Sequence, residues 1–266
     1  MTFDDYRKIE AINASSLKAI LRSPAYYLWR MQQEDYDSDA MRLGRAVHAA
    51  VLEPEAFRAE FATFPGTRRG KAWDEFKASH DPRSILTETQ HDKAVRIAAA
   101  VRAHPTAARW LAKGKAEQTI TWTDARTGRE CKARLDWIGS CVLDLKTCAD
   151  PDPFAFARTC VTYRYPLQMA FYYDGARAAL GFDGPVKILA VGSAEPHEVV
   201  PYDVPEAFLD LGRYQYRQAM DTLIECEKSN RWPGLCDTEM CLSLPEWAYD
   251  GGGDLGLTMD GEAVVL

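Results

Sequence analysis

The sequence lacks any long uncharged apolar stretch, and it lacks the features of a secretory leader. No uncharged run in its 266 residues approaches the roughly 18 apolar residues that a membrane-spanning helix needs. The first five residues have neither the basic segment nor the apolar segment of a signal peptide. We therefore expect no membrane role.

Cysteine is absent from the first 130 residues, and the later cysteines show no disulfide spacing. The seven that are present are Cys131, Cys141, Cys148, Cys160, Cys226, Cys236 and Cys241. An odd number without a framework spacing is typical of a reducing compartment. We expect the protein to be cytoplasmic.

Basic residues are absent from the end of the chain. No Lys or Arg follows Arg231, whereas seven acidic residues do: Asp237, Glu239, Glu246, Asp250, Asp254, Asp260 and Glu262. The net charge of −7 comes from 32 basic and 39 acidic residues, so without these seven the remainder is balanced. A net negative charge would argue against a nucleic-acid partner, because phosphate binding favours a basic surface. That objection applies to the tail and not to the body of the protein.

Length and composition are those of an ordinary folded protein. Apolar residues make up 47% and charged residues 27% of the chain, which excludes collagen, coiled coils and extensive disorder. No internal repeat or low-complexity linker precedes the tail. We therefore predict a folded domain at residues 1–235 and an acidic C-terminal tail at residues 236–266.

Apolar spacing and capping residues predict a helical N-terminal region. We expect helices ending at residue 21, beginning at residue 24, and covering residues 40–52, 88–104 and 107–113. Asn13 or Ser15 would cap the first, and the Thr87–Gln90 capping box would open the fourth.

After Gly114 the apolar period changes to two, which is typical of strands. We expect a three-strand meander followed by helices, two further strands and a long last helix, with these ranges: 117–122, 131–138, 142–146, 153–163, 166–180, 187–191, 198–204 and 205–229. The order predicts an α/β or α+β fold, in which helices flank a mixed central sheet.

The length of one hairpin loop decides where two carboxylates point. A three-residue loop at 139–141 would set Asp136 opposite Asp144, whereas a two-residue loop would place them on opposite faces. Side chains alternate along a strand, so Lys146 shares the face of Asp144. By the same alternation, residues 131, 133, 135 and 137 would share the other face of their strand from Asp136. We predict the three-residue loop, or a bulge with the same effect.

Two carboxylates and a lysine on one sheet face suit Mg²⁺, which binds carboxylate oxygens, water and substrate phosphate oxygens. A neighbouring lysine would orient or deprotonate the attacking water in phosphodiester hydrolysis. The alternative is a surface hairpin of solvated charges, which is the usual state of an isolated Asp-x-Lys sequence.

Several short motifs in a fixed order resemble one nuclease family. They are NASSLK at 13–18, SPAYY at 23–27, LGRAVHAAVLEP at 43–54, RLD at 134–136, DLKT at 144–147, QMAFY at 168–172 and WPG at 232–234. Together they resemble the RecE-type exonucleases (exodeoxyribonuclease VIII) of the PD-(D/E)xK nuclease superfamily, which are related to lambda-type exonuclease and to RecB nuclease domains. The resemblance implies a PD-(D/E)xK nuclease core over about residues 12–248.

The resemblance also implies a metal site. Asp136 and Asp144 would bind metal, the carbonyl of Leu145 would be a further ligand, and Lys146 would be the catalytic lysine. We expect Mg²⁺, with Mn²⁺ as a substitute and two ions per active site.

Four more residues match positions near that site in RecB-like relatives. His48 corresponds to a histidine metal ligand and Glu117 to an additional metal-associated glutamate. Gln168 and Tyr172 correspond to the Q-x-x-x-Y element that borders the site, and they share a helix face. Taken alone, His48 and Tyr172 would be core residues and Glu117 an exposed strand end.

Other residues are candidates for binding DNA. Ser15 and Lys8 match residues that hold a 5′-phosphate in lambda-type enzymes, and Arg134 is a third candidate, although Ser15 would equally serve as a helix cap. A basic loop near Trp73 would grip the DNA backbone, or would simply be solvated: Arg68, Arg69 and Lys71.

Some RecB-like nucleases hold an iron–sulfur cluster partly through C-terminal cysteines. Cys236 and Cys241 have a comparable position, but those clusters also need a cysteine near the N-terminus. Because the first cysteine here is Cys131, we expect no iron–sulfur cluster.

The resemblance implies a Mg²⁺-dependent double-strand DNA exonuclease that works 5′ to 3′ and leaves 3′ single strands for annealing in DNA recombination and repair. It also implies a homo-oligomeric ring around DNA, a trimer or a tetramer, and a single-strand annealing protein as partner. Two alternatives are a Cas4- or RecB-like nuclease of other polarity or single-strand preference, and a non-catalytic DNA-end-binding module. The acidic tail would repel DNA, dock a basic partner or only increase solubility.

Overall fold

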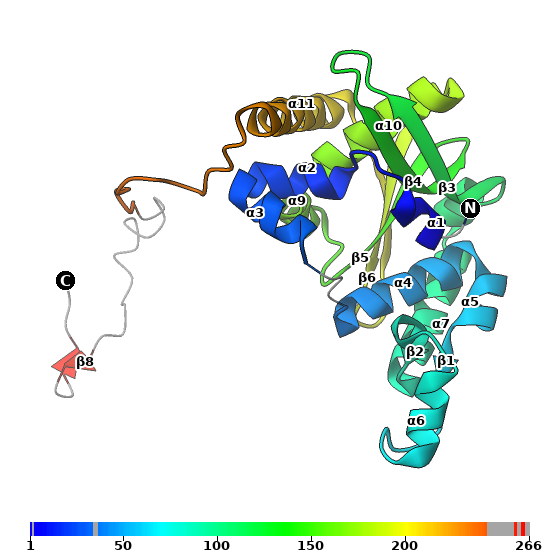
Figure 1. Ribbon diagram of the computed structural model, residues 1–266. Coiled ribbons are helices and arrows are strands. Elements are labelled where there is room, and N and C mark those ends of the chain that lie inside the picture. Colours follow the sequence, from blue (N-terminus) through cyan, green and yellow to red (C-terminus); the bar gives the residue numbers. More distant parts are fainter. Residues whose placement is uncertain (2, 34–36, 244–257, 260–261, 264–266) are drawn as a thin grey trace.

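A five-stranded mixed sheet lies at the centre of the protein (Figure 1). The computed structural model describes residues 1, 3–33, 37–243, 258–259 and 262–263. In spatial order the strands are β3 (Gly114–Thr123), β4 (Glu130–Gly139), β5 (Val142–Cys148), β6 (Val186–Gly192) and β7 (Val199–Asp203). Only β5 and β6 are parallel, because helices connect them, and the other neighbours are antiparallel. The predicted meander and mixed sheet are confirmed.

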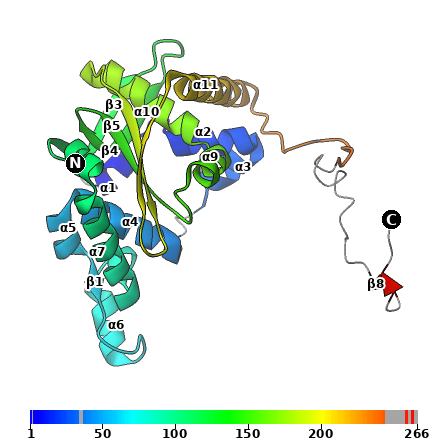
Figure 2. The same cartoon turned by 180° about the vertical axis from the view of Figure 1, so that it is seen from behind.

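Helices cover both faces of this sheet (Figures 1 and 2). One face packs against four helices: α2 (Ala14–Arg22), α9 (Pro153–Thr162), α10 (Tyr165–Leu180) and α11 (Glu206–Ser229). The other face packs against another four: α4 (Asp39–Leu52), α5 (Pro54–Glu60), α7 (Glu88–Ala103) and α8 (Pro105–Trp110). Apolar residues of β5 and β6 pack into both interfaces, which explains why these central strands are buried along most of their length.

The N-terminal helices begin at capping residues. The Asn13 side chain accepts from the backbone N–H of Ser16, so Asn13 and not Ser15 caps α2. Ser23 caps α3 (Pro24–Met31) in the same way, and Thr87 with Gln90 forms the predicted capping box of α7. Local side-chain acceptors therefore determine where these helices start.

Three short helices were not predicted from the sequence. They are α1 (Phe3–Lys8), α5 and α6 (Lys71–Ala78). The strand β1 (Ala62–Thr63) lies between α5 and α6. A 3₁₀ turn at Pro82–Ser84 and the strand β2 (Ile85–Leu86), which pairs parallel with β1, follow α6. Elements of six to eight residues are too short to show a clear apolar period, which accounts for the omission.

Most of the predicted acidic tail lies outside the described residues. Within it, β8 (Thr258–Met259) pairs antiparallel with β9 (Glu262–Ala263). In the part of the chain that the structure describes, no helix combines the length and the apolar character needed to span a membrane.

Helices α10 and α11 approach each other closely at Gly212, and a side chain there is expected to destabilise the protein. A Cβ added at Gly212 would lie 1.9 Å from the backbone oxygen of Pro166, which has no room to move. Gly212→Ala is therefore expected to lower the free energy of unfolding by about 3 kcal/mol, measured by urea denaturation.

Gly44 provides the matched control, because it lies inside α4 with no atom within 4 Å of an added Cβ. Gly44→Ala is expected to raise the free energy of unfolding by about 0.5 to 1 kcal/mol. Equal effects of the two substitutions would contradict the close approach of α10 and α11.

Candidate active site

The hairpin between β4 and β5 has the register that the sequence predicted. Ile138 pairs with Val142 and Trp137 with Leu143, so residues 139–141 form a three-residue loop. The same register sets Asp136 opposite Asp144, but the backbone ladder stops before this pair. The side chain of Asp136 enters the gap, where its Oδ2 accepts from the backbone N–H of Leu145 at 2.8 Å.

The strand β3 is distorted where it faces Asp136. Glu117 lies between the paired residues Ala116 and Gln118 and has a φ of 49°, a left-handed conformation that is uncommon for glutamate. Strained backbone of this kind clusters at functional sites, where it directs a side chain.

The alternation of side chains along β4 also breaks at this point. Leu135 packs toward α10, but Trp137 packs in the cluster on the opposite face with α4 and α7. The expectation that residues 131, 133, 135 and 137 share one face is therefore wrong for Trp137. The physical reason is the distortion at Asp136 and Glu117. Neither the pairing of β3 with β4 nor that of β4 with β5 includes Asp136, so the backbone of β4 is free to depart from regular alternation there.

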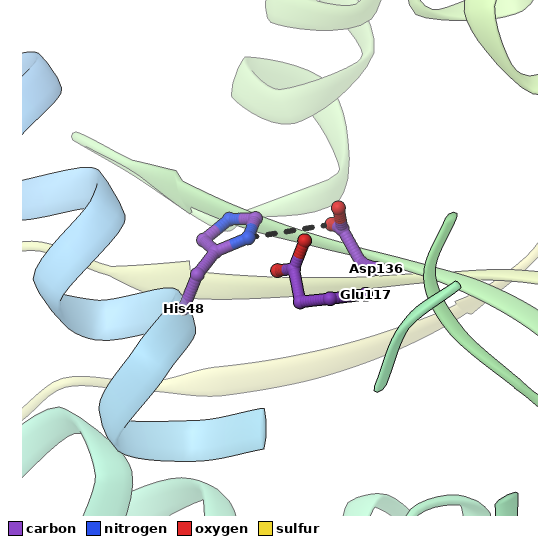
Figure 3. A group of neighbouring side chains, drawn as sticks. All are labelled: His48, Glu117 and Asp136. Carbon is purple, nitrogen blue, oxygen red and sulfur yellow. Dashed lines mark ion pairs between the residues drawn. The ribbon is translucent and has the colours of Figure 1, made fainter. Parts of the chain in front are cut away.

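Three ligand-bearing side chains from three elements meet at this distortion (Figure 3). His48 comes from α4, Glu117 from β3 and Asp136 from β4, and their ligand atoms all lie within 4.8 Å of one another. The Nδ1 of His48 is 3.6 Å from Oδ2 of Asp136. An imidazole and two carboxylates at this separation are suitable ligands for a divalent metal.

Asp144 lies beside this trio, and donors orient both of its oxygens. Only 1% of its surface is exposed. Oδ1 accepts from the side-chain amide Nε2 of Gln168 at 2.8 Å, and Oδ2 forms an ion pair with Lys146. The ammonium group of Lys146 also lies 4.9 Å from the centre of the Tyr165 ring. A carboxylate held from two sides in this way has little freedom to turn.

Burial and crowding of like charge make the carboxylates hard to ionise. Burial, and then repulsion from Asp144, raises the pKa of Asp136 to about 7. Burial, and then repulsion from Asp136, raises the pKa of Glu117, although its hydrogen bond to Arg134 opposes the shift. The site therefore holds more negative charge than its surroundings favour, which a divalent cation would offset.

The basic groups of the site respond to the same surroundings. Burial, and then the charge of Lys146, lowers the pKa of His48, so its imidazole favours the neutral, metal-binding form. A hydrogen bond between His48 and the backbone of Leu145 partly opposes this shift of the His48 pKa. For Lys146, burial lowers the pKa, but the charges of Asp144 and Asp136 outweigh it and the pKa lies above its ordinary value. The residues present thus fit a divalent metal with a protonated lysine beside it.

Comparison with known proteins agrees with this geometry. The sequence matches the family model described as a PDDEXK-like domain of unknown function (DUF3799) over residues 13–244. The chain belongs to this family. Like the predicted core, the sheet with flanking helices is therefore a PDDEXK-like fold.

Solved structures give a second comparison for the DUF3799 domain. A protein from Eubacterium rectale that is provisionally named an exonuclease has 16% sequence identity and a TM-score of 0.63, with 95% of this chain and 98% of that chain covered. At this identity the likeness shows a shared fold. The structure of SSO0001, at 12% identity over 91% of this chain and 98% of that chain, has a TM-score of 0.32 and is too different to support an argument. No curated protein matches the chain significantly in sequence.

In this DUF3799 domain the two predicted residues of α10 both lie beside the carboxylates. Gln168 binds Asp144 directly. Burial, and then repulsion from Asp144 and Asp136, raises the pKa of the Tyr172 phenol well above its ordinary value. Tyr172 also packs against the apolar core, so the core interpretation and the site interpretation hold together.

The three residues predicted to bind a 5′-phosphate come from three elements, α1, α2 and β4. Arg134 donates to Oε2 of Glu117 at 2.6 Å and therefore joins the site. Ser15 is exposed on the first turn of α2, and Lys8 is exposed at the end of α1, 3.8 Å from Asp5. Their phosphate-binding roles stay predictions.

The basic loop before α6 lies away from the carboxylates. The guanidinium of Arg68 lies 5.3 Å from the centre of the Trp73 ring, and Lys71, which begins α6, is 3.7 Å from Glu75. Both views place α6 at the end of the helical region that is remote from the sheet (Figures 1 and 2). A contact of Arg68, Arg69 and Lys71 with DNA stays a prediction.

Sequence reasoning missed Lys18, which reaches the site from α2. Its Nζ donates to Oε1 of Gln168 at 2.7 Å and lies 5.4 Å from the centre of the Tyr165 ring. Burial, and then the charge of Lys146, lowers the pKa of Lys18 to about 7. A signal was present: Lys18 is four residues after Ala14 and three before Leu21, in the apolar stripe of an amphipathic helix.

Metal binding by this DUF3799 site is expected to weaken as the pH falls below about 7. The folded-state pKa of Asp136 is about 7, against about 4 for an ordinary aspartate, so below pH 7 a bound metal has to displace a proton. We expect Mn²⁺ affinity, measured by calorimetry, to fall by roughly tenfold between pH 8 and pH 6.

The raised pKa of Asp136 has the opposite pH dependence in its effect on the stability of the metal-free protein. A raised pKa contributes stability that is complete below the unfolded-state pKa and is lost as the pH rises through about 7. The stabilisation by Mn²⁺ is therefore expected to be largest near pH 8. An affinity that does not change between pH 6 and pH 8 would contradict the raised pKa of Asp136.

Proposed function

We propose that the protein is a Mg²⁺-dependent exonuclease that degrades double-stranded DNA. The observation that supports this most strongly is the grouping of Asp136, Asp144 and Lys146 with His48 and Glu117 inside a PDDEXK-like domain. The likeness in fold to a protein provisionally named an exonuclease adds support. A surface hairpin of solvated charges does not account for a buried Asp144 with both oxygens bound.

Each residue has a defined task in this proposal. His48, Glu117, Asp136 and Asp144, together with the Leu145 carbonyl, hold Mg²⁺, with Mn²⁺ as a substitute and two ions per site. The bound ions supply an acidified water and stabilise charge on the phosphate and the leaving oxygen. Around the metal ligands, protonated Lys146 positions the attacking water, Gln168 holds Asp144, and Tyr172 borders the site.

We further propose that degradation runs 5′ to 3′ and leaves 3′ single strands for annealing recombination. The motifs from 13–18 to 232–234 that resemble RecE-type exonucleases support this polarity. Ser15, Lys8 and Arg134 are the candidates for holding a terminal 5′-phosphate. A ring of three or four subunits around DNA and a single-strand annealing partner complete the proposal, and a mass measurement in solution tests the ring.

Digestion of end-labelled duplexes tests the polarity. The substrates are linear duplexes that carry a label at one 5′ end or at one 3′ end, each with and without a 5′-phosphate. We expect early release of the 5′ label, late release of the 3′ label and faster digestion of the phosphorylated substrate. Early release of the 3′ label would instead favour a Cas4- or RecB-like nuclease of the other polarity.

A further inference from the structure

A continuous chain of polar contacts connects α2 to the carboxylate of Asp144. Lys18 donates to Oε1 of Gln168 at 2.7 Å, and Nε2 of Gln168 donates to Oδ1 of Asp144 at 2.8 Å. The second oxygen of Asp144 is paired with Lys146, and both lysines lie over the ring of Tyr165. The four polar side chains and the Tyr165 ring together form a closed cycle of contacts.

The hydrogen-bonding groups on either side of Gln168 permit only one orientation of its side-chain amide. An amide has a donor end and an acceptor end of nearly equal size, so shape alone does not distinguish them. Ionised Asp144 only accepts hydrogen bonds, and Lys18 offers N–H donors in either protonation state. Satisfying both neighbours requires the nitrogen to face Asp144 and the oxygen to face Lys18, as the two distances indicate.

We propose that Lys18 is a positioning residue of this site, which fixes the amide of Gln168 and thereby holds Asp144 in its metal-binding orientation. The inference rests on the proposed function only in that it takes Asp144 as a metal ligand. Among the described residues, no contact joins Lys18 to His48, Glu117 or Asp136. Its direct partner is Gln168, so Lys18 acts on the site through that residue. Partners that orient a ligand in this way commonly change metal affinity by tenfold or more.

A purely electrostatic role would have the opposite effect. Lys18 is close enough to Asp144 and Lys146 to interact with both charges. A nearby cation repels a metal ion, so its removal would strengthen metal binding if charge were its only contribution. The sign of the change in affinity therefore distinguishes positioning from charge.

The test is a double-mutant cycle read by Mn²⁺ affinity in the full chain, measured by electron paramagnetic resonance. Lys18→Met is expected to weaken Mn²⁺ binding about tenfold, whereas Lys18→Arg, which keeps the donors, stays within about threefold. In a Gln168→Met background, Lys18→Met is expected to cause no further loss, because the residue through which it acts is absent.

Lys228→Met is the matched control, since it removes a positive charge from an exposed position of α11. Its Mn²⁺ affinity is expected to equal that of the parent protein. A melting curve of every variant confirms folding. If Lys18→Met does not fold, Lys18→Gln replaces it, because a glutamine at this position does not dictate one orientation of the Gln168 amide. Stronger binding in Lys18→Met, unchanged binding, or an equal loss in both backgrounds would overturn the inference.

Nuclease assays separate this inference from the proposed function. In Lys18→Met the Mg²⁺ concentration for half-maximal digestion is expected to rise about tenfold, with a smaller change in rate at saturating Mg²⁺. If the parent protein binds Mn²⁺ but digests no DNA, the proposed function fails while the Mn²⁺ cycle still tests Lys18. If the parent digests DNA and Lys18→Met has the same Mg²⁺ dependence, only the inference about Lys18 fails.

Discussion

Lys146→Ala is expected to lower the rate of Mg²⁺-dependent DNA digestion by about a thousandfold without preventing metal binding. The ammonium of Lys146 is paired with Asp144 and lies in the site where the water would be activated. Loss of a positioned proton-transfer group typically costs 10² to 10⁴ in rate. Because the substitution also removes a positive charge next to the carboxylates, Mn²⁺ affinity is expected to be equal or higher, measured alongside the rate.

Lys187→Ala is the matched control for that variant. Lys187 lies on the neighbouring strand β6, where it pairs with Asp203 at 2.6 Å and does not contact the carboxylate site. Its digestion rate is expected to stay within about threefold of the parent rate. If Lys146→Ala digests DNA as fast as the parent protein, Lys146 is not the catalytic lysine and the assignment of the site is wrong.

Asp136→Asn is expected to make the metal-free protein more stable while it removes metal binding. Ionised Asp136 is disfavoured in the fold, since burial and then Asp144 raise its pKa to about 7. Asparagine is neutral at pH 8 and keeps an oxygen that accepts from the backbone N–H of Leu145, as Asp136 does at 2.8 Å. We expect the melting temperature in EDTA at pH 8 to rise by roughly 5 °C.

The same variant is expected to lose the increase in melting temperature that Mn²⁺ gives the parent protein, because one ligand of the trio has become a poor one. Asp92→Asn, at an exposed position of α7, is the control and is expected to behave like the parent in both measurements. A lower melting temperature of Asp136→Asn in EDTA, or an unchanged response to Mn²⁺, would contradict the assignment of Asp136 as a metal ligand in a site of crowded negative charge.

Sequence patterns predicted those parts of the structure that depend on local interactions. The cap at Thr87, and the cap at Asn13 that was one of two candidates, satisfy backbone donors within the next three residues, so they are readable without any tertiary information. The same holds for the loop at 139–141, where turn length alone determines the register of Asp136 against Asp144.

The rest of the site depends on contacts between distant segments. His48 and Glu117 were identified through the family resemblance, because nothing in their own helix or strand shows that they meet Asp136. Lys18 and Gln168 are 150 residues apart along the chain, and no spacing rule connects them. Trp137 was placed on the wrong face because strict alternation does not foresee the left-handed backbone of Glu117 opposite Asp136.

The balanced charge of residues 1–231 is compatible with the proposed substrate. Several of its negative charges are carboxylates of the candidate site that a bound metal would offset, including Asp136 and Asp144. The acidic excess after Arg231 belongs to the part of the chain that lies mostly outside the described residues. Its role in repelling DNA or docking a basic partner stays a prediction.

The most direct test of a metal-dependent nuclease that acts at DNA ends is digestion of linear and covalently closed circular duplexes of the same sequence. Acid-soluble nucleotides are measured over time with Mg²⁺ and with EDTA. The expected result is that the linear duplex is degraded only with Mg²⁺ and that the circle stays intact. Degradation of the circle at the same rate, degradation in EDTA, or no degradation of the linear duplex with Mg²⁺ would contradict it.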